Sequence, residues 1–377
     1  MKIALLGLGT VGGAVYKAIT EKKTDLFKDF NVEIKYVLVR TKENKSFALD
    51  VLTLDYEEIL NDEEIEVVIE MMGARVSYDY IKQALNHHKN VITANKEVIA
   101  SHFKELEELA KKNNVKLLYE ASVGGSIPII GVLSDATMVN EITTIKGILN
   151  GTCNYILTNM HKNKMNFNDA LALAQENGFA EADPSADLKG LDMVRKIKIL
   201  SEIAYKSEID LDKIYSYGIE NINKEIIDVI DLLGYSLKLM CYSRLEDENI
   251  YIGVEPFMLN RDDLCNVNYE FNVVEYIGSN CDKQIMVGKG AGIKTANSIL
   301  IDLKKFIYGY NSNYKIVNNY KTIGGDFSCF KYFVKPIEEL DMDLIDINLG
   351  DFYITKKLNY EEFKLIQNKI SFYAKIN

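Results

Sequence analysis

The sequence predicts an α/β protein that opens with a doubly wound parallel sheet. It continues into an α+β domain with an open sheet and a short C-terminal α+β segment. Three observations support this prediction. Short apolar runs alternate with helical periods in the first part of the chain, a glycine-rich turn follows the first run, and the later apolar runs are longer and alternate in polarity.

The composition is that of a globular protein. The chain has 377 residues, of which 47% are hydrophobic and 26% charged, and this length suggests two or three domains. The net charge of −11 disfavours nucleic acid as a partner. The five cysteines are scattered without paired spacing, which favours a reducing cytoplasm over a disulfide framework. Only four histidines are present, so a metal held by histidines is not expected.

The N-terminal stretch MKIALLGLGTVGGAV has the apolar character of a signal peptide, but its glycines break the helix that such a peptide needs, and no cleavage site follows. Elsewhere no apolar run approaches the roughly 18 residues that span a bilayer. We therefore expect a soluble, cytoplasmic protein without a membrane partner.

The first elements alternate regularly. The strands expected are residues 2–6, 32–40, 65–73, 90–96 and 115–122, with helices that end at about residue 23 and that cover 77–88 and 102–113. Because strands alternating with helices of this length form parallel βαβ units, a doubly wound sheet should result.

The pattern then changes. The strands expected are residues 141–150, 249–259 and 268–278, with helices around 185–206 and 223–241. One face of such a sheet needs cover, and a second copy of the chain would cover it, so we expect a homodimer. Residues 287–309 return to a glycine turn and a helix. The last elements read as strand, strand, helix and strand, at residues 329–336, 351–358, 360–369 and 371–376.

The stretch GLGTVG matches G-x-G-x-x-G between the first strand and the first helix. Gly7 allows the tight turn, Gly9 lets the backbone approach a pyrophosphate, and Gly12 lets the helix pack closely on the strand. The N–H groups of this turn, with Thr10 and Val11 among the predicted contacts, and the helix dipole would bind the phosphates. This context favours a Rossmann-type dinucleotide site over a structural glycine turn.

The end of the second strand should select the cofactor. A carboxylate there would bind a ribose hydroxyl, whereas an arginine accommodates a 2′-phosphate. Arg40 stands at this position, and no carboxylate follows before Glu43. We predict NADP(H) as the preferred cofactor and NAD(H) as the alternative. The competing interpretation of Arg40 is a solvated strand end.

Two further turns lie where ligands of open α/β sheets collect. Thr93 and Lys96 close a strand at the carboxyl edge, so Lys96 either points into the cleft or lies on the surface. The small residues from Glu120 to Pro128 place many backbone groups together. Carbonyls there would ligate a hard cation, but a loop joining two domains is the simpler interpretation.

Residues 146–157, KGILNGTCNYIL, end a strand and begin a helix. Thr152 is the expected N-cap, and the free amides beside it would suit a substrate carboxylate. From the spacing alone, an ordinary capped helix is the favoured interpretation.

The most unusual stretch is GFAEADPSADLKGLDMVRKIKIL, residues 178–200, in which several carboxylates precede Lys196. The simple interpretation is a solvated loop with a surface ion pair between Asp192 and Lys196, worth about 0.3–0.5 kcal/mol.

Taken together, these segments resemble homoserine dehydrogenase over about residues 1–310. The order GLGTVG, TANK, EASVGGSIP, GILNGTCNYIL, GFAEADPSADLKGLDMVRK and GKGAGIKTA is that family's order at its usual spacings. The acidic segment is the most specific, because few other dehydrogenases carry it. The resemblance implies interconversion of L-homoserine and L-aspartate 4-semialdehyde with NAD(P), in threonine, methionine and isoleucine biosynthesis.

The resemblance also implies site residues. Lys196 falls on the catalytic lysine and Lys96 on the second active-site lysine; Glu181 falls on the glutamate that holds substrate, with Asp187 and Asp192 as acidic neighbours. Further predicted substrate contacts are Gly151 and Thr152. The predicted cofactor contacts are Gly7, Gly9, Thr10, Val11, Gly12, Arg40, Gly73, Thr93, Lys96, Gly178, Gly290 and Gly292. The implied ligands of sodium or another monovalent cation, largely main-chain carbonyls, are Glu120, Val123, Gly125 and Ile127.

Three positions depart from the family's pattern: Ser126 replaces a small glycine, Phe179 a tyrosine and Cys153 a threonine. The tail departs further, because FKYFVKPIEELD lacks the glycine turn that opens the family's ACT domain. We therefore predict no ordinary threonine feedback through the tail.

The resulting division has three parts. Residues 1–130 with about 288–310 should form the dinucleotide-binding domain, residues 131–287 the substrate-binding and dimerisation domain, and residues 311–377 a C-terminal segment, with a degenerate ACT-like module as one form it could take. Two other functions stay open: another Rossmann-type amino-acid dehydrogenase, and an NADPH-binding regulatory protein without turnover.

Overall fold

A computed structural model describes residues 1–377 except 23, 43–46, 74–75, 291, 311–315 and 326–327. The chain divides into two compact units. The first contains Met1–Asp135 and Gly290–Ile316, and the second contains Ala136–Lys289 and Val317–Asn377. The predicted fold class is confirmed, with a parallel sheet in the first unit and an open mixed sheet in the second. The functional limits of the three predicted parts remain a prediction.

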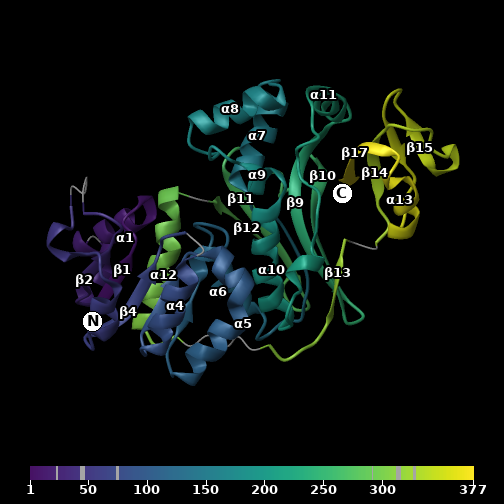
Figure 1. Ribbon diagram of the computed structural model, residues 1–377. Coiled ribbons are helices and arrows are strands. Elements are labelled where there is room, and N and C mark those ends of the chain that lie inside the picture. Colours follow the sequence, from purple (N-terminus) through teal and green to yellow (C-terminus); the bar gives the residue numbers. More distant parts are fainter. Residues whose placement is uncertain (23, 43–46, 74–75, 291, 311–315, 326–327) are drawn as a thin grey trace. The chain divides into compact units, whose positions relative to one another are not determined.

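The first unit is built on a six-stranded parallel sheet in the order β3-β2-β1-β4-β5-β6 (Figure 1). Its strands are β1 (Lys2–Leu6), β2 (Glu33–Leu38), β3 (Leu52–Thr53), β4 (Ile65–Glu70), β5 (Asn90–Thr93) and β6 (Leu117–Leu118). The chain winds outward from β1 to β3 and then starts again at β4, on the other side of β1. The carboxyl ends of β1 and β4 therefore form the switch point at which open α/β sheets bind ligands.

Helices cover this sheet, so β1 and β4 are apolar almost throughout. The helices are α1 (Thr10–Thr20), α2 (Asp25–Asp29), α3 (Tyr56–Asn61), α4 (Ser77–Asn86), α5 (Lys96–Lys112), α6 (Ile129–Ala136) and α12 (Thr295–Ile307), with short 3₁₀ turns η1 (Leu49–Val51), η2 (Glu120–Ser122) and η4 (Gly292–Lys294). Although α12 comes late in the chain, it contacts α1 (Figure 1). Ile299 and Leu303 of α12 join Val15 and Ile19 of α1 in one core.

The second unit is built on an eleven-stranded sheet. Its main path is β12-β11-β7-β9-β10-β17-β14-β16-β15, and β8 and β13 also pair with β10. The strands are β7 (Ile142–Ile148), β8 (Tyr215–Ser216), β9 (Tyr235–Glu246), β10 (Asn249–Asn260), β11 (Phe271–Gly278), β12 (Asp282–Lys289), β13 (Lys321–Gly324), β14 (Lys331–Pro336), β15 (Ile345–Asn348), β16 (Tyr353–Thr355) and β17 (Ile370–Ile376). Most pairs are antiparallel, but β8, β13 and β17 lie parallel to β10.

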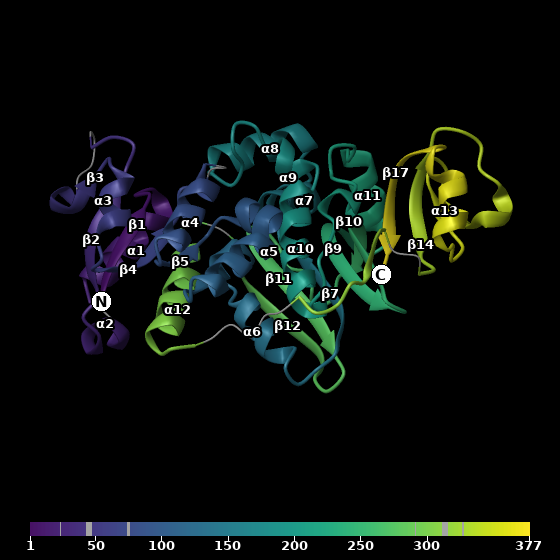
Figure 2. The same ribbon diagram turned by 60° about the horizontal axis from the view of Figure 1, so that its bottom comes forward.

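The helices of the second unit are α7 (Gly151–Lys162), α8 (Phe167–Glu176), α9 (Ser185–Leu188), α10 (Leu191–Tyr205), α11 (Lys224–Leu232) and α13 (Tyr360–Gln367), with 3₁₀ turns η3 (Leu211–Lys213) and η5 (Met342–Leu344). Helices α7, α10 and α11 contact β9. Figure 2 shows α13 against β14 and β17. Phe363 and Ile366 of α13 pack there with Tyr332, Val334 and Tyr373.

One of the predicted helices is too long. The helix expected around 223–241 ends at Leu232, and the residues from Tyr235 belong to strand β9. Gly234, with φ of +83°, adopts the left-handed conformation that ends a helix. The apolar pattern continues through this glycine, which is why the period alone suggested one long helix.

Within the part of the chain that the structure describes, no helix is both long and apolar enough to cross a bilayer.

Candidate active site

The glycine turn after β1 has the geometry expected of each of its glycines. Gly7 has φ of +100°, which only glycine adopts readily. A Cβ on Gly12 would lie 2.3 Å from the Gly7 carbonyl oxygen, so only glycine lets α1 pack this closely. A Cβ on Gly9 would meet nothing within 4 Å, so open space lies beside that backbone. Thr10 and Val11 then form the first turn of α1, which carries no acidic side chain.

A buried carboxylate that the sequence analysis missed holds the neighbouring turns. Glu70 ends β4 and is fully buried. Its Oε1 accepts hydrogen bonds from the Met72 N–H at 2.7 Å and the Ser77 hydroxyl at 2.8 Å. Its Oε2 accepts one from the Thr93 hydroxyl at 2.6 Å. Glu70 thereby fixes the ends of β4 and β5, beside Gly73 with φ of +68°. The sequence signal that could have indicated this role is the glutamate at the very end of an otherwise largely apolar strand.

The prediction that Lys96 closes a strand is wrong, because Lys96 begins helix α5. Strand β5 ends at Thr93, and Asn95 is the N-cap whose side chain accepts a hydrogen bond from the Val98 N–H at 3.1 Å. Asparagine at this position starts a helix because it satisfies an N–H group that lacks an intrahelical partner. Lys96 is partly buried and stands at the carboxyl edge of the sheet.

The other predicted cofactor contacts of the first unit also lie at turns. Arg40 is exposed two residues after β2 ends. Gly292 has φ of +77° and open space where a Cβ would stand, and Gly290 precedes it. Ala291 and Glu43 lie outside the described residues.

The predicted cation ligands lie in a buried turn. Glu120 begins the 3₁₀ turn η2, Val123 follows it, and Gly125 adopts a left-handed conformation with φ of +60°. The Gly125 carbonyl accepts a hydrogen bond from the Ser298 hydroxyl at 2.6 Å, and the Ile127 carbonyl accepts one from the Ile129 N–H at 2.8 Å. Because a carbonyl oxygen has two lone pairs, each retains capacity for a cation.

The side chain of Glu120 is already committed elsewhere. It accepts hydrogen bonds from the N–H groups of Ile130 and Gly131 at 2.7 and 2.9 Å and pairs with Lys305 at 2.6 Å. Burial, together with the charge of Glu120, raises the pKa of the adjacent Asp302 to about 7. Glu120 therefore joins α6 to α12, and only its carbonyl remains a candidate ligand.

In the second unit the structure joins Lys196 directly to one of its predicted neighbours, Asp192, and indirectly, through Asn150, to another, Asp187. Lys196 is 8% exposed, and its Nζ donates to the Leu149 carbonyl at 2.6 Å and to Asp192 Oδ2 at 2.7 Å. The ion pair is buried, so the interpretation of residues 192 and 196 as a solvated surface pair is wrong.

Asn150 connects the two aspartates and was not singled out from the sequence. Its side-chain N–H groups donate to Asp187 Oδ1 at 2.7 Å and to Asp192 Oδ2 at 2.9 Å. Its Oδ1 accepts from the Cys153 N–H at 2.8 Å, so Asn150 is the N-cap of α7. Thr152, the predicted cap, is instead the second residue of the helix and donates to the Phe179 carbonyl at 2.6 Å. Asparagine ranks above threonine as an N-cap, a signal that the prediction overlooked.

Glu181 is not brought into this cluster. Its side chain is exposed, and no hydrogen bond or ion pair joins it to Asp187, Asp192 or Lys196, all of which the structure describes. Gly178, with φ of +74°, follows the end of α8, and its neighbour Phe179 stacks on Tyr155 with ring centroids 4.4 Å apart. The substrate role of Glu181 and the cofactor role of Gly178 remain predictions.

Two cysteines adjoin the cluster without forming a nucleophile. Burial, with the charges of Asp187 and Asp192, raises the pKa of the Cys153 thiol well above its usual value. Burial also raises the pKa of the Cys241 thiol to about 12. Since the thiolate is the reactive form, neither thiol is suited to covalent catalysis at neutral pH.

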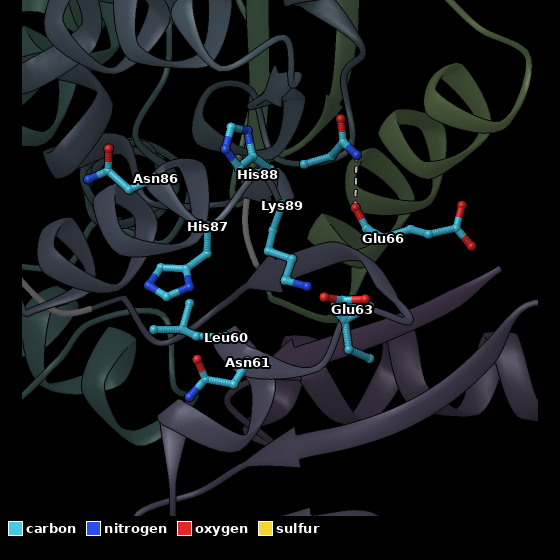
Figure 3. A pocket seen from close by; sticks show the side chains of 10 residues that line it. Leu60, Asn61, Glu63, Glu66, Asn86, His87, His88 and Lys89 are labelled. Atoms are coloured by element: carbon cyan, nitrogen blue, oxygen red, sulfur yellow. Dashed lines mark hydrogen bonds between the residues drawn. The ribbon is translucent and has the colours of Figure 1, made fainter.

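A hollow of about 700 Å³ in the first unit lies at the opposite edge of the parallel sheet (Figure 3). It is lined by the ends of α3 and α4 and the starts of β4 and β5, with His87, His88 and Lys89 around it. It is therefore remote from the carboxyl edge at which such sheets bind cofactors. The described residues contain no group of three or more histidine, cysteine or acidic side chains arranged to hold a metal ion.

Comparison with known proteins decides the family. A model of the homoserine dehydrogenase domain matches residues 128–303, and a model of the homoserine dehydrogenase NAD-binding domain matches residues 7–120. The curated homoserine dehydrogenase of Bacillus subtilis (strain 168) is 38% identical over 311 residues, which are 80% of this chain and 72% of that protein. The chain belongs to the homoserine dehydrogenase family.

Solved structures of this family agree. A homoserine dehydrogenase from Thiobacillus denitrificans is 26% identical, with a TM-score of 0.90, and the match covers 100% of this chain and 98% of that chain. The Staphylococcus aureus homoserine dehydrogenase is 30% identical, with a TM-score of 0.80 over the same shares.

Family membership fixes the broad activity. The chain is an oxidoreductase of amino-acid biosynthesis that uses a nicotinamide cofactor and a small-molecule substrate. Nothing in the structure or the comparisons favours the two other functions considered above.

Proposed function

We propose that the chain interconverts L-homoserine and L-aspartate 4-semialdehyde by hydride transfer, in the biosynthesis of threonine, methionine and isoleucine. The observation that carries this proposal is the arrangement, in a family member, of the buried Lys196, Asp192 and Asn150 with the partly buried Asp187. A bound nicotinamide supplies the hydride acceptor or donor.

Lys196 is the proposed proton-transfer residue. An ammonium has three hydrogens, and Lys196 directs two of them to Leu149 and Asp192. The third is then the one for the reacting oxygen of the substrate. In the reductive direction Lys196 donates this proton, and in the oxidative direction the neutral amine takes it back. Lys96 is the proposed second active-site lysine.

The carboxylates and the start of α7 would hold the amino-acid part of the substrate. Asp187 and Asp192 are fixed by Asn150, so their oxygens need no reorganisation to meet an ammonium group. The N–H groups of Gly151 and Thr152 lie in the first turn of α7, where a helix favours a carboxylate. Glu181 would complete the site only if its exposed side chain moves inward.

Substrate analogues test this proposal. The value of kcat/KM for L-homoserine should exceed that for 4-hydroxybutanoate, which lacks the ammonium group, by about 100-fold or more, because the analogue offers no charge-assisted hydrogen bonds to Asp187 and Asp192. Steady-state oxidation with each compound gives the ratio. Comparable values for the two compounds would overturn the assignment of Asp187 and Asp192.

Arg40 supports NADP(H) as the preferred cofactor, since its exposed guanidinium at the end of β2 suits a 2′-phosphate. The Arg40→Asp variant should bind NADPH about tenfold more weakly and NADH no more weakly than the parent, because a carboxylate suits the ribose hydroxyl. Titration of both cofactors measures this. Lys28→Asp, the same change of charge on exposed helix α2, is the control. An equal loss for both cofactors in Arg40→Asp contradicts the preference.

A sodium or other monovalent cation is proposed at the turn of Glu120, Val123, Gly125 and Ile127. The buried carbonyls of Gly125 and Ile127 supply the hard oxygen ligands that such an ion prefers. At constant ionic strength, replacement of sodium by tetramethylammonium should lower the turnover about threefold or more, because this ion is too large to enter the turn. Unchanged turnover in both salts would remove the cation from the account.

The proposed homodimer has less support than the sequence suggested. The sheet face carrying Met240, Tyr242 and Phe257 is already packed against Phe330 and the loop around Cys265. Exposed apolar surface remains near the free edge strand β12, where Val287 is 52% exposed. Sedimentation equilibrium tests the dimer, and the mass of a single chain at micromolar concentration would exclude it.

The cytoplasmic location stays a prediction, supported by five cysteines that are all unpaired; cell fractionation tests it.

A further inference from the structure

The C-terminal strand β17 is fixed to the centre of the second unit. It lies parallel to β10, with Phe257 opposite Lys375. Lys375 Nζ pairs with Glu255 Oε2 at 2.6 Å, and both side chains are almost fully buried. The Tyr242 hydroxyl donates to the same carboxylate oxygen. Removing either charge would leave the other buried and unpaired, so this attachment is specific.

A chain of hydrogen bonds runs from this carboxylate to strand β8. The Tyr373 hydroxyl donates to Glu255 Oε1 at 2.8 Å, so it must accept the proton of the Tyr215 hydroxyl, 2.9 Å away. Gln367 of α13 donates in turn to the Tyr215 hydroxyl at 3.1 Å. Burial, with the charge of Glu255, raises the pKa of Tyr373 well above its usual value, which keeps this donor protonated. The C-terminal segment thus contacts Tyr215 through two of its elements.

Tyr217 makes a second link. Its ring stacks on that of Tyr373, with centroids 4.6 Å apart and an interplanar angle of 9°. Its hydroxyl donates to the Ser371 carbonyl at 3.3 Å. Aromatic pairs of this kind contribute beyond the area they bury, so β17 packs firmly against β8 and the residue Tyr217 that follows it.

The residues next to Tyr217 hold the turn between α9 and α10. The Ile219 N–H donates to the Leu188 carbonyl at 2.8 Å, and the Ser216 hydroxyl donates to the Lys189 carbonyl at 2.6 Å. A Cβ on Gly218 would lie only 1.9 Å from the Leu188 carbonyl oxygen, so the two backbones are in direct contact. A hollow of about 320 Å³ lies beside the same turn, between Leu191 and Asn221. The turn therefore borders a hollow on one side and is held on the other by Ser216 and the two residues Gly218 and Ile219 that follow β8.

This turn lies between the two aspartates of the candidate site. Asp187 precedes it in α9, and Asp192 follows it in the first turn of α10, one helical turn before Lys196. A shift of the Leu188–Gly190 backbone would change the distance of both carboxylates from Asn150. It would also change the direction in which the Lys196 ammonium points. Misplacement by about 1 Å is enough to lower a rate severely, even when the altered residue is remote from the chemistry.

We propose that the C-terminal segment positions the catalytic lysine and its aspartates, through the contact of Tyr373 with Tyr215 and Tyr217 and the contact of Gly218 and Ile219 with Leu188. The C-terminal segment then helps to hold the active-site residues in place. This inference rests on the proposed role of Lys196. Tyr215 and Tyr217 are positioning residues, since neither belongs to the Lys196 cluster.

The test compares three variants of the full chain. Tyr217→Leu removes the stacked ring, Tyr217→Phe keeps it, and Phe352→Leu is a matched control. Phe352 is buried in the same segment, but it stacks on Phe333 rather than against β8. Thermal unfolding first establishes that each variant folds. Steady-state kinetics then give kcat and both KM values, and hydrogen exchange gives the protection of the amides from Leu188 to Lys196.

Tyr217→Leu should lower kcat about tenfold, with the cofactor KM within about twofold of the parent value. Tyr217→Phe should keep kcat close to that of the parent. Only Tyr217→Leu should show faster exchange at residues 188–196. Unchanged kcat and exchange in Tyr217→Leu, or equal losses in Phe352→Leu, would overturn the proposal. Hydrogen exchange is measured without substrate, so it reports on the contact between the C-terminal segment and the turn independently of catalysis. If Tyr217→Leu exchanged faster but Lys196 proved dispensable for turnover, the catalytic role of Lys196 would be refuted and the structural contact would stand.

Discussion

Replacement of Lys196 by methionine is expected to lower kcat by about 100-fold or more while the cofactor dissociation constant stays within about twofold of the parent value. Methionine keeps most of the side-chain volume but cannot transfer a proton. Either replacement removes the cation that pairs with the buried Asp192, and loss of one partner of a buried pair typically costs about 3–5 kcal/mol. Alanine would in addition leave a cavity. The methionine variant therefore separates chemistry from stability better.

Lys189→Ala is the matched control for this experiment, because it removes an exposed lysine from the same segment. It should keep the parent kcat. Thermal unfolding of both variants shows whether either fold is weakened. If Lys196→Met retained more than about a tenth of the parent kcat, another group would have to transfer the proton.

The second large effect concerns the glycine turn after β1, where Gly9→Ala and Gly12→Ala should fail in different ways. A Cβ on Gly12 would stand 2.3 Å from the backbone oxygen of Gly7, so Gly12→Ala should lower the free energy of unfolding by about 1–3 kcal/mol and weaken cofactor binding. A Cβ on Gly9 meets no neighbour within 4 Å. Gly9→Ala should therefore keep the parent stability and weaken NADPH binding about tenfold, since the pyrophosphate must approach that backbone.

Denaturant unfolding and NADPH titration of the two variants measure this difference. Equal stability of Gly12→Ala and the parent would contradict the packing role of Gly12. Undiminished NADPH affinity in Gly9→Ala would mean that the cofactor does not approach the turn at Gly9.

Features that depend on neighbouring residues could be predicted from the sequence. The parallel sheet followed from alternating strands and helices, and the turn at residues 7–12 from the spacing of its glycines. The same local reasoning failed where one residue overrode a pattern. Gly234 divides a continuous apolar period into helix α11 and strand β9, and Asn150 rather than Thr152 caps α7.

Features that depend on distant contacts could not be predicted in this way. No spacing rule joins Glu70 to Thr93 or Asn150 to Asp187, because the fold alone brings these side chains together. Burial likewise decides the character of the pair of Asp192 and Lys196, which on an exposed helix face would be a weak surface interaction. The contact of Tyr217 with Tyr373 spans most of the second unit's sequence and leaves no local signal.

The most direct test of the proposed activity is the loss of NADPH absorbance on addition of L-aspartate 4-semialdehyde, measured for the parent chain and for Lys196→Met at matched concentrations. We predict rapid NADPH oxidation by the parent, slower oxidation of NADH, and at most about a hundredth of the parent rate for the variant. Binding of NADPH without any oxidation, or equal rates for the two proteins, would contradict the reaction or the role of its lysine.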